Sequence, residues 1–410
     1  MRRVVITGIG AVTPIGTGVT DLWNGVLASC SAVRRITRFD PSPFASQIAA
    51  GLSDFDPSEY LDPRSVRRLD RCSQFAVAAS KLAVRDAGLE LENVNRARVG
   101  VCIGSALGGA AFAEEQHEAY MTRGARAVAP SLALQVFVGA GSCSTAIELG
   151  LTGYSTSNAD SCASGTIAIG NAFRVIQRGD ADVMLAGGSE APLAPLCFGA
   201  FSLIRAMSIR NDDPEGACRP FDRDRDGFVM GEGSAVLILE DRDHALRRGA
   251  SAYAEVAGYA LTNDGHHMTA PRPDGEPAAQ CISLCFADAG LSANCVDYVN
   301  AHGSSTPLND PTETVAIRKA LGSHADEVPV SGTKAMHGHA LGATGAIEAA
   351  ICCLAMKNSY IPPTINLNVP GTGCDLDYVP NVGREKRLRT VLSNSFGFGG
   401  INACLLLTSP

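Results

Sequence analysis

One cysteine in this sequence stands where its thiol could act as a nucleophile. Cys162 lies in the segment NADSCASG, residues 158–165, which runs directly into an apolar stretch with the character of a helix. A thiol at a helix N-terminus faces unpaired backbone N–H groups and the positive end of the helix dipole, and both favour the thiolate. The segment therefore predicts a reactive cysteine, because a buried structural cysteine needs none of these features.

Three side chains far downstream are candidate partners for that thiol. His302 lies in NAHGSSTP, residues 300–307, and the segment SGTKAMHGH, residues 331–339, holds both Lys334 and His339. Each segment follows a predicted strand, which is where reactive groups collect in proteins built of alternating strands and helices. Taken alone, each histidine fits a structural role as well as a catalytic one.

A further segment, SNSFGFGG at residues 393–400, sets glycine and small polar residues around two phenylalanines. Such a loop can point backbone N–H groups at an oxyanion, or it can form a tight turn. Both interpretations stay open from these residues alone.

The elements that must position these groups form a repeat. A helix predicted at residues 74–89 ends in DAGL and leads to a strand at 99–103 and then to a Gly-Ser pair. A helix predicted at 278–287 is followed by the same DAGL, by a strand at 296–299 and again by Gly-Ser. The shared order indicates an internal duplication.

A second correspondence supports the duplication. Apolar helices that open with glycine are predicted at residues 164–177, before a strand at 182–186, and at residues 342–357. Strands and helices in alternation predict mostly parallel sheets covered by helices on both faces, which is the α/β class.

We set the two halves at residues 1–249 and 250–410, with the charged stretch 240–249 as the junction. No low-complexity linker separates them, so they should form one compact body. Facing halves would bring Cys162 of the first half toward the two histidines of the second.

Composition narrows the class of protein. The chain has 410 residues, of which 46% are hydrophobic and 19% charged, so it can bury one large core or two fused cores. No apolar run approaches the roughly 18 residues that a membrane helix needs. A first strand, VVIT at residues 4–7, is predicted to stop at Gly8, and the Arg2-Arg3 pair before it is only superficially a twin-arginine signal, so we expect a cytoplasmic protein.

Cysteine spacing and net charge argue against other classes. The 14 cysteines include no C-x-x-C pair, so a zinc knuckle has no support, and most of them should be small buried hydrophobic residues. The net charge of −8 argues against a nucleic-acid surface.

Three segments resemble known binding or catalytic motifs but lack residues that those motifs require. DRDRDG at residues 222–227 opens like a calcium loop, but Gly233 stands where a bidentate glutamate is required. GIG at residues 8–10 has Thr13 in place of the third glycine of a dinucleotide-binding loop. SGTK at residues 331–334 matches S-x-x-K without the partner motifs of penicillin-recognising enzymes. We therefore predict no redox or organic cofactor.

Taken together, the ordered motifs resemble those of the β-ketoacyl-[acyl carrier protein] synthases, the condensing enzymes of dissociated fatty acid and polyketide synthesis. The resemblance covers nearly the whole chain and favours the elongating Cys-His-His type. It implies the thiolase-type duplicated five-layer α-β-α-β-α fold, which agrees with the repeat. The segments that carry it are DSCASG at 160–165, residues 300–306 with Asn309 and Asp310, residues 334–345 with Glu348, SNSFGFGG at 393–400, PFD at 220–222, DGFVMGEG at 226–233 and IPPTIN at 361–366.

The resemblance implies a role for each reactive group. Cys162 is the nucleophile that takes an acyl chain from an acyl carrier protein as a thioester. His302 and His339 donate to the thioester oxygen of malonyl carrier and stabilise the enolate that decarboxylation leaves. The backbone N–H groups of Cys162 and Phe398 form the oxyanion hole, and Phe398 also resembles the aromatic gate between acyl entry and malonyl entry.

Other roles are implied in the same way. Lys334 orients the second histidine, and Glu313 and Glu348 hold the surrounding network. The family resemblance alone implies a bound monovalent cation near Glu348, Ser393 and Asn394, and no other metal.

Two sets of residues match substrate and partner contacts of the family. Those matched to the pantetheine arm and the acyl chain are Ser304, Thr306, Thr269 and Ala113, and a plain turn is the alternative for the first two. Carrier proteins are acidic, so a local basic patch should meet them despite the net negative charge. The matched arginines are Arg64, Arg67, Arg68 and Arg205, for which a solvated charged face is the alternative.

Departures from the family pattern favour a specialised pathway. Asp160 and Ser161 replace the uncharged residues expected before the cysteine, and an unpaired carboxylate there would raise the thiol pKa. Residues 130–144 depart in a region that shapes the acyl pocket and the dimer contact. Ala113 is small where bulkier pocket residues are common, which leaves room for a longer or stiffer chain.

The sequence favours an elongating ketosynthase that acts on acyl- and malonyl-loaded carrier protein as a homodimer. The main alternative is the ketosynthase subunit of a specialised type II polyketide synthase, paired with a chain-length-factor homologue. A silent chain-length subunit would lack Cys162, a thiolase would need a second cysteine where this chain has Phe398, and a starter synthase of the Cys-His-Asn type conflicts with His339.

Overall fold

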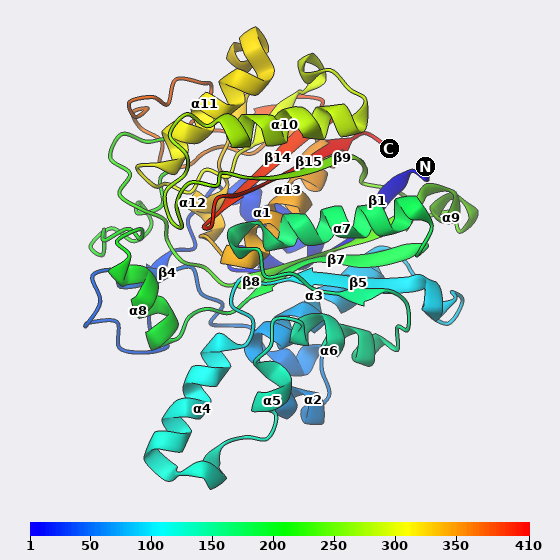
Figure 1. Ribbon diagram of the computed structural model, residues 1–410, viewed down its shortest axis with the longest axis vertical. Coiled ribbons are helices and arrows are strands. Elements are labelled where there is room, and N and C mark those ends of the chain that lie inside the picture. The colour runs from blue at the N-terminus through cyan, green and yellow to red at the C-terminus, as the bar shows by residue number, and fades with distance from the viewer.

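The computed structural model of the protein describes residues 1–410 and stacks them in five layers, in the order helix, sheet, helix, sheet, helix (Figure 1). The two ends of the chain lie close together at one side of the stack (Figure 1).

Each sheet has five main strands with the same pattern of neighbours, and the short β2 pairs in addition with β1 of the first sheet. In spatial order the first sheet holds β6 (Ser155–Thr156), β5 (Val99–Gly104), β7 (Val183–Glu190), β8 (Gly233–Asp241) and β1 (Val4–Thr13), and the second holds β11 (Val330–Ser331), β10 (Tyr298–Asn300), β14 (Thr390–Gly397), β15 (Ile401–Thr408) and β9 (Ala254–Asn263). In each sheet the first three strands are parallel, and each of the last two runs antiparallel to the strand before it. The sheets join where β1 and β9 pair. The predicted duplicated fold is therefore confirmed.

Helices cover the outer faces of both sheets. α3 (Arg71–Asp86) packs on β1 and β8 with α6 (Ala140–Leu149) beside it, and α10 (Glu276–Ala289) packs on β9 and β15 with α11 (Asn309–Leu321) beside it. The two DAGL segments lie where α3 and α10 end. Their glycines, Gly88 and Gly290, adopt left-handed φ angles of 56° and 64°, which suits the ends of helices.

Two long helices form the middle layer between the sheets. α7 (Ser164–Arg178) packs on β5 and β7 of the first sheet and on β9 and β15 of the second, and α13 (Thr344–Asn358) packs on β8 and β14. Every residue of α13 from Thr344 to Met356 is buried. A helix that is apolar on nearly all sides belongs in a core, so both halves share this layer.

The two middle helices approach each other closely at their N-terminal ends. A β-carbon placed on Gly165 would lie 2.9 Å from the carbonyl oxygen of Gly342 and 2.9 Å from the amide nitrogen of Ala346. Glycine is required there because no side chain fits. The contact sets the start of α7, just after Cys162, against the start of α13, just after His339.

The first strand is longer than predicted. β1 continues through Gly8 to Thr13, with a bulge beside this glycine. β-carbons on Gly8 and Gly10 would lie 2.5 and 1.9 Å from backbone carbonyl oxygens of α3. The glycines let α3 lie directly on the strand and do not end it.

The remaining helices and strands complete the fold. They are α1 (Gly18–Ala28), α2 (Pro63–Arg68), α4 (Ala110–Arg123), α5 (Leu132–Gln135), α8 (Pro195–Leu203), α9 (Arg242–Arg247), α12 (Lys334–His337), β2 (Gly16–Thr17), β3 (Arg34–Arg35), β4 (Ile48–Ala49), β12 (Tyr360–Ile361) and β13 (Arg384–Glu385). None of the helices has the length and apolar character needed to cross a membrane. The cytoplasmic location and the boundary between residues 249 and 250 stay predictions.

Candidate active site

The cysteine that the sequence singles out lies at the start of α7. Ser161–Ala163 forms one turn of 3₁₀ helix, in which Ser161 has a left-handed φ of 52°. Such a φ is uncommon for a residue with a side chain, and strained backbone of this kind concentrates at functional sites. Cys162 is 8% exposed and lines a cavity of about 260 Å³.

The cavity gathers residues from both halves of the chain. Cys162 comes from the first half, and His302, His339 and Phe398 come from the second. Of the other predicted site residues, the cavity is also lined by Ser304, Thr306, Thr269, Arg205 and Glu313. The structure thus places a thiol, two imidazoles and a glycine-rich loop around one space.

The two imidazoles lie side by side at the cavity. The ring centroids of His302 and His339 are 5.4 Å apart, with the rings nearly perpendicular. His339 Nδ1 lies 3.0 Å from Thr344 Oγ1, and His302 Nδ1 lies 3.4 Å from Lys334 Nζ. Because Nδ1 of each ring has a partner, Nε2 is the nitrogen left to meet a substrate oxygen.

Lys334 contacts the first histidine and not the second. Its ammonium donates to the backbone carbonyl of His302 and, at 2.6 Å, to Glu348 Oε1. The prediction that Lys334 orients His339 is therefore wrong, because its side chain turns back toward the loop after β10 and Thr344 holds His339 instead. An ammonium has three donors, so it can also donate to His302 Nδ1 and fix that ring's proton on Nε2.

Both imidazoles are neutral in this setting. Burial lowers the pKa of His302 and of His339 well below the usual value, and the positive charge of Lys334 lowers both further. A neutral ring with its proton on Nε2 can donate a hydrogen bond to a developing negative charge without first losing a proton.

The thiol of Cys162 is not a thiolate in the resting protein. Burial raises its pKa, so the expected preference for the thiolate does not hold. The Ser161 hydroxyl, the Lys334 charge and the backbone N–H of Phe398 each act in the opposite direction. A helix N-terminus favours the thiolate, but desolvation of the buried site outweighs this effect.

Glu190, and not Asp160, is the carboxylate that acts on this thiol. The charge of Glu190 raises the pKa of Cys162. Burial contributes most to the raised pKa of the Tyr259 hydroxyl, and the charge of Asp160 raises that pKa further. Glu190 ends β7, is fully buried and accepts from the backbone N–H groups of Ala106 at 2.6 Å and Gly342 at 3.0 Å. It thereby links the loop after β5 to the start of α13. Burial raises its own pKa to about 7.

Glu313 holds the loop that carries His302. Its carboxylate, on α11, accepts from the backbone N–H groups of His302 and Gly303, each at 2.8 Å, and from Asn394 Nδ2 at 3.3 Å. Burial raises the pKa of Glu313 and these backbone donors lower it. The contacts fit the supporting role that the family resemblance implied.

The residues near Glu348 fit a monovalent cation. Three buried oxygens there have no hydrogen-bond partner, namely Glu348 Oε2, Ser393 Oγ and Asn300 Oδ1. Asn300 and Ser393 are paired neighbours on β10 and β14. Hard cations take oxygen ligands. The carboxylates of Glu313 and Glu348 are both buried, and only that of Glu348 is paired with an ammonium, that of Lys334. Bound there, a cation would supply positive charge.

Other predicted residues lie away from the cavity. Ala113 is on α4, half-buried, and does not line this space. Three of the matched arginines are exposed on α2, namely Arg64, Arg67 and Arg68, and do not line it either. Their roles stay predictions. No group of three or more His, Cys, Asp or Glu side chains that could hold a metal ion is present.

Sequence reasoning missed several residues that line the cavity. The ring of Phe201, on α8, is stacked on that of Phe398 with centroids 6.3 Å apart. Asp264 is 8% exposed and accepts from Asn402 Nδ2 at 2.8 Å. Met268 also lines the space. No motif contains these residues, and only the tertiary fold brings them to the thiol.

A cysteine at the start of one central helix, with two histidines beside the start of its symmetry-related partner, defines a condensing enzyme of the thiolase type. The chain belongs to the β-ketoacyl synthase family, since the Beta-ketoacyl synthase N-terminal domain matches residues 1–245 and the C-terminal domain matches residues 253–368.

Relatives and solved structures agree with this family. The chain is 47% identical over 407 residues to 3-oxoacyl-[acyl-carrier-protein] synthase 2 of Coxiella burnetii, covering 99% of this chain and 98% of that protein. A type II PKS ketosynthase, solved with its acyl-carrier protein and bound to the hexaketide, superposes with a TM-score of 0.93 at 37% identity over 100% of both chains. The ishigamide ketosynthase/chain length factor gives 0.94 at 36% identity, covering 100% of this chain and 99% of that one.

Proposed function

We propose that this protein extends an acyl chain by decarboxylative condensation with malonyl carrier protein, giving a β-ketoacyl carrier protein. The observation that carries the proposal is the cavity in which Cys162, the neutral His302 and His339, and the Phe398 loop meet. Membership of the β-ketoacyl synthase family and the 3-oxoacyl-[acyl-carrier-protein] synthase activity named for the Coxiella burnetii relative support it.

The first step loads the enzyme. The sulfur of Cys162 attacks the acyl thioester of the carrier protein, the new C–S bond forms, and the bond to the pantetheine sulfur breaks. The departing pantetheine thiolate takes up the proton that Cys162 loses. Lys334 and the Phe398 N–H oppose the effect of burial on the pKa of Cys162, so they favour the charged sulfur during attack.

The second step makes the carbon nucleophile. Malonyl carrier loses carbon dioxide, and the electron pair of the broken C–C bond passes into an enolate. Nε2 of His302 and of His339 donates to the enolate oxygen, and neutral rings are suited to this because neither must give up a charge. The enolate carbon attacks the acyl group on Cys162, the C–S bond breaks, and the sulfur regains a proton from water.

Acyl carrier protein is the partner that this reaction requires. Arg205, exposed at the cavity, could meet the acidic carrier surface, and Arg64, Arg67 and Arg68 add positive charge on α2. Ser304 and Thr306 offer hydroxyls to the pantetheine arm inside the cavity.

A second subunit would cover the apolar surface beside β6. This strand is the edge of the first sheet, and exposed edges and apolar patches mark interaction surfaces. The exposed apolar side chains on α5, α6 and around β6 are Leu134, Phe137, Ile147 and Tyr154. We propose a dimer through this face, either with a second copy of the chain or with a chain-length-factor homologue.

The pathway follows from the acyl chain that the enzyme accepts. The 47% identity to a 3-oxoacyl synthase 2 favours fatty acid elongation. A type II polyketide role is the second candidate, favoured by the two ketosynthase structures at TM-scores of 0.93 and 0.94. Incubation with malonyl carrier and a panel of saturated and polyunsaturated acyl carriers, followed by mass spectrometry of the products, separates the two roles.

The reaction itself is tested with Cys162→Ala. The wild-type protein should gain the mass of an acyl group from acyl carrier and then release a product two carbons longer when malonyl carrier is added. The variant should do neither, and Cys30→Ala, at an exposed thiol away from the cavity, should behave as wild type. Normal condensation by Cys162→Ala would show that the proposed reaction is wrong.

A further inference from the structure

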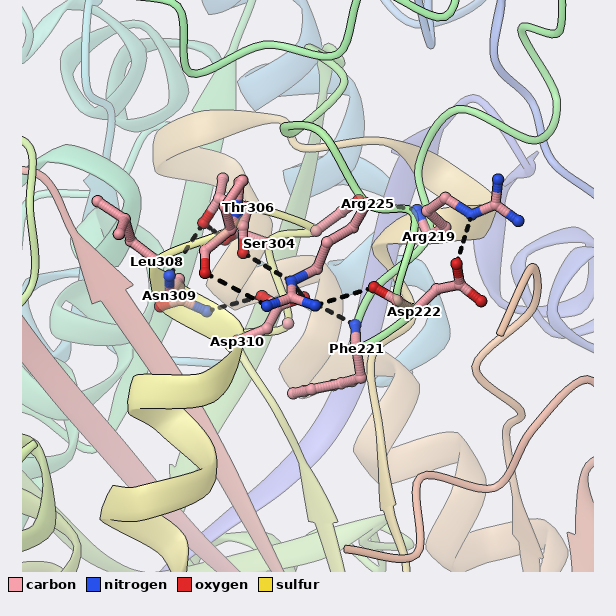
Figure 2. Close-up of polar contacts among 12 residues, drawn as sticks. Arg219, Phe221, Asp222, Arg225, Ser304, Thr306, Leu308, Asn309 and Asp310 are labelled. Carbon is pink, nitrogen blue, oxygen red and sulfur yellow. Dashed lines mark hydrogen bonds and ion pairs between the residues drawn. The ribbon is translucent and has the colours of Figure 1, made fainter. Parts of the chain in front are cut away.

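The segment that looks like a calcium loop has a different use in the structure. Arg225, from DRDRDG at residues 222–227, extends beneath the loop that carries Ser304 and Thr306, and its side chain is only 8% exposed (Figure 2). Its guanidinium donates to the backbone carbonyls of Thr306 at 3.0 Å and Pro307 at 3.3 Å. A buried guanidinium that binds backbone carbonyls fixes the path of that backbone.

The guanidinium is also anchored by two groups outside the loop. It donates to the backbone carbonyl of Asp222 at 2.9 Å and lies 3.7 Å from the carboxylate of Asp310. Asp310 is fully buried and accepts from the backbone N–H of Phe221 at 2.7 Å and from Asn309 Nδ2 at 3.2 Å (Figure 2). The position of Arg225 is therefore set by groups on both sides of it.

Backbone groups on either side of Arg225 hold the middle of the loop. The backbone N–H of Arg219 donates to Ser305 Oγ at 2.9 Å, and that of Gly227 donates to the Ser305 carbonyl at 3.1 Å. Ser305 has a left-handed φ of 66°, which a residue with a side chain adopts only when its surroundings enforce it. The segment around Arg225 supplies that enforcement.

The hydroxyls on the other side of the loop line the cavity. Ser304 Oγ and Thr306 Oγ1 lie 2.9 Å apart, and Thr306 Oγ1 accepts from the backbone N–H of Asn309 at 3.1 Å. Since the Thr306 carbonyl is bound to Arg225, rotation of this peptide would move both hydroxyls.

We propose that Arg225 is a positioning residue for the pantetheine subsite. By binding the Thr306 and Pro307 carbonyls, it fixes the positions of the Ser304 and Thr306 hydroxyls. The inference rests on the proposed function, because it concerns the arm by which carrier-bound substrates enter. The requirement is for arginine, since only a planar fork reaches two loop carbonyls, the Asp222 carbonyl and the Asp310 carboxylate together, whereas a lysine ammonium is a point donor.

The test compares Arg225→Lys and Arg225→Met with wild type. The KM for malonyl carrier should rise about tenfold in Arg225→Lys while kcat changes little, because binding of the arm is lost and the reacting groups are untouched. The alkylation rate of Cys162 by iodoacetamide, which has no pantetheine arm, should equal that of wild type. Arg223→Met is the matched control, since Arg223 is two residues away, exposed and paired only with Asp224.

A triple variant separates positioning from general stability. In a Thr306→Ala, Ser304→Ala background the hydroxyls are gone, so Arg225→Lys should raise the KM no further. An unchanged KM in the single variant would overturn the proposal, and so would an equal loss of kcat and of Cys162 alkylation, which would mark a purely structural role. If wild-type protein does not condense at all, the proposed function fails first, and that result is seen before any variant is measured.

Discussion

The ammonium of Lys334 and the carboxylate of Glu348 lie 2.6 Å apart, and neither side chain is exposed. Lys334 also binds the backbone of His302, so this buried pair connects the second central helix to the catalytic loop. Removal of one partner from a buried pair leaves a charge that has neither water nor a counter-ion.

Lys334→Met should therefore lower the free energy of unfolding by about 3–5 kcal/mol, because Glu348 is left unpaired. The double variant Lys334→Met, Glu348→Gln should be less destabilised than the sum of its single changes. Urea unfolding measures all three. Lys319→Met breaks an exposed pair of similar length with Glu276 and should cost about 1 kcal/mol or less. Equal costs for the two lysine variants would contradict the importance of burial.

Cys162→Gln should decarboxylate malonyl carrier without condensing it. The glutamine cannot hold an acyl group, yet the two imidazoles still stabilise the enolate. Adding His302→Ala should lower the decarboxylation rate by about 10²–10³, the cost of removing one oxyanion donor. His324→Ala, at a ring outside the cavity, is the control. Carbon dioxide release measures the rate, and an unaffected rate in the His302 variant would show that the enolate assignment is wrong.

The pH dependence of decarboxylation by Cys162→Gln should be flat where an ordinary histidine titrates. Burial lowers the pKa of His302 and of His339, so each ring stays neutral as the pH falls through about 6.5, the value for a free imidazole. Lowered pKa values mean that protonation, and with it loss of activity, occurs only at lower pH. Rates measured from about pH 8 down to about pH 6 check this. A fall centred near pH 6.5 that persists in Glu190→Gln, which removes the carboxyl whose pKa is about 7, would mean that a catalytic ring is exposed to solvent.

A monovalent cation should stabilise the folded protein through the oxygens near Glu348. Potassium or sodium chloride should raise the melting temperature above that in tetramethylammonium chloride of equal ionic strength. At ten times the dissociation constant, cation binding should increase the free energy of unfolding by about 1.4 kcal/mol. Ser393→Ala should reduce the difference. Ser46→Ala also removes a buried hydroxyl that has no partner, but at another place, and should leave the difference intact. Identical melting temperatures in all salts would rule the cation out.

Patterns confined to neighbouring residues were enough to predict the duplicated fold. The two DAGL segments do end equivalent helices, and the glycine-opened stretches do form the two central helices. Helix ends and apolar periodicity depend on residues that are close in sequence, so they can be predicted from it. Gly8 misled the strand prediction because its function is to admit α3, an element that lies far along the chain.

Contacts between segments that are far apart in the sequence could not be predicted in this way. The direction of the Lys334 side chain depends on Glu348 and on the loop after β10, neither of which adjoins it in sequence. Glu190 ends a strand and belongs to none of the motifs weighed, yet its charge acts on the nucleophile. The thiol pKa was misjudged for a related reason, since burial is a property of the folded whole.

The backbone N–H of Phe398 belongs to the last 13 residues of the chain. During synthesis on the ribosome, Cys162 emerges long before this group and before Lys334. Until β14 and β15 pair, the thiol lacks both the burial that raises its pKa and the groups that oppose that effect. The order of translation thus delays assembly of the complete site until both halves of the chain have been made.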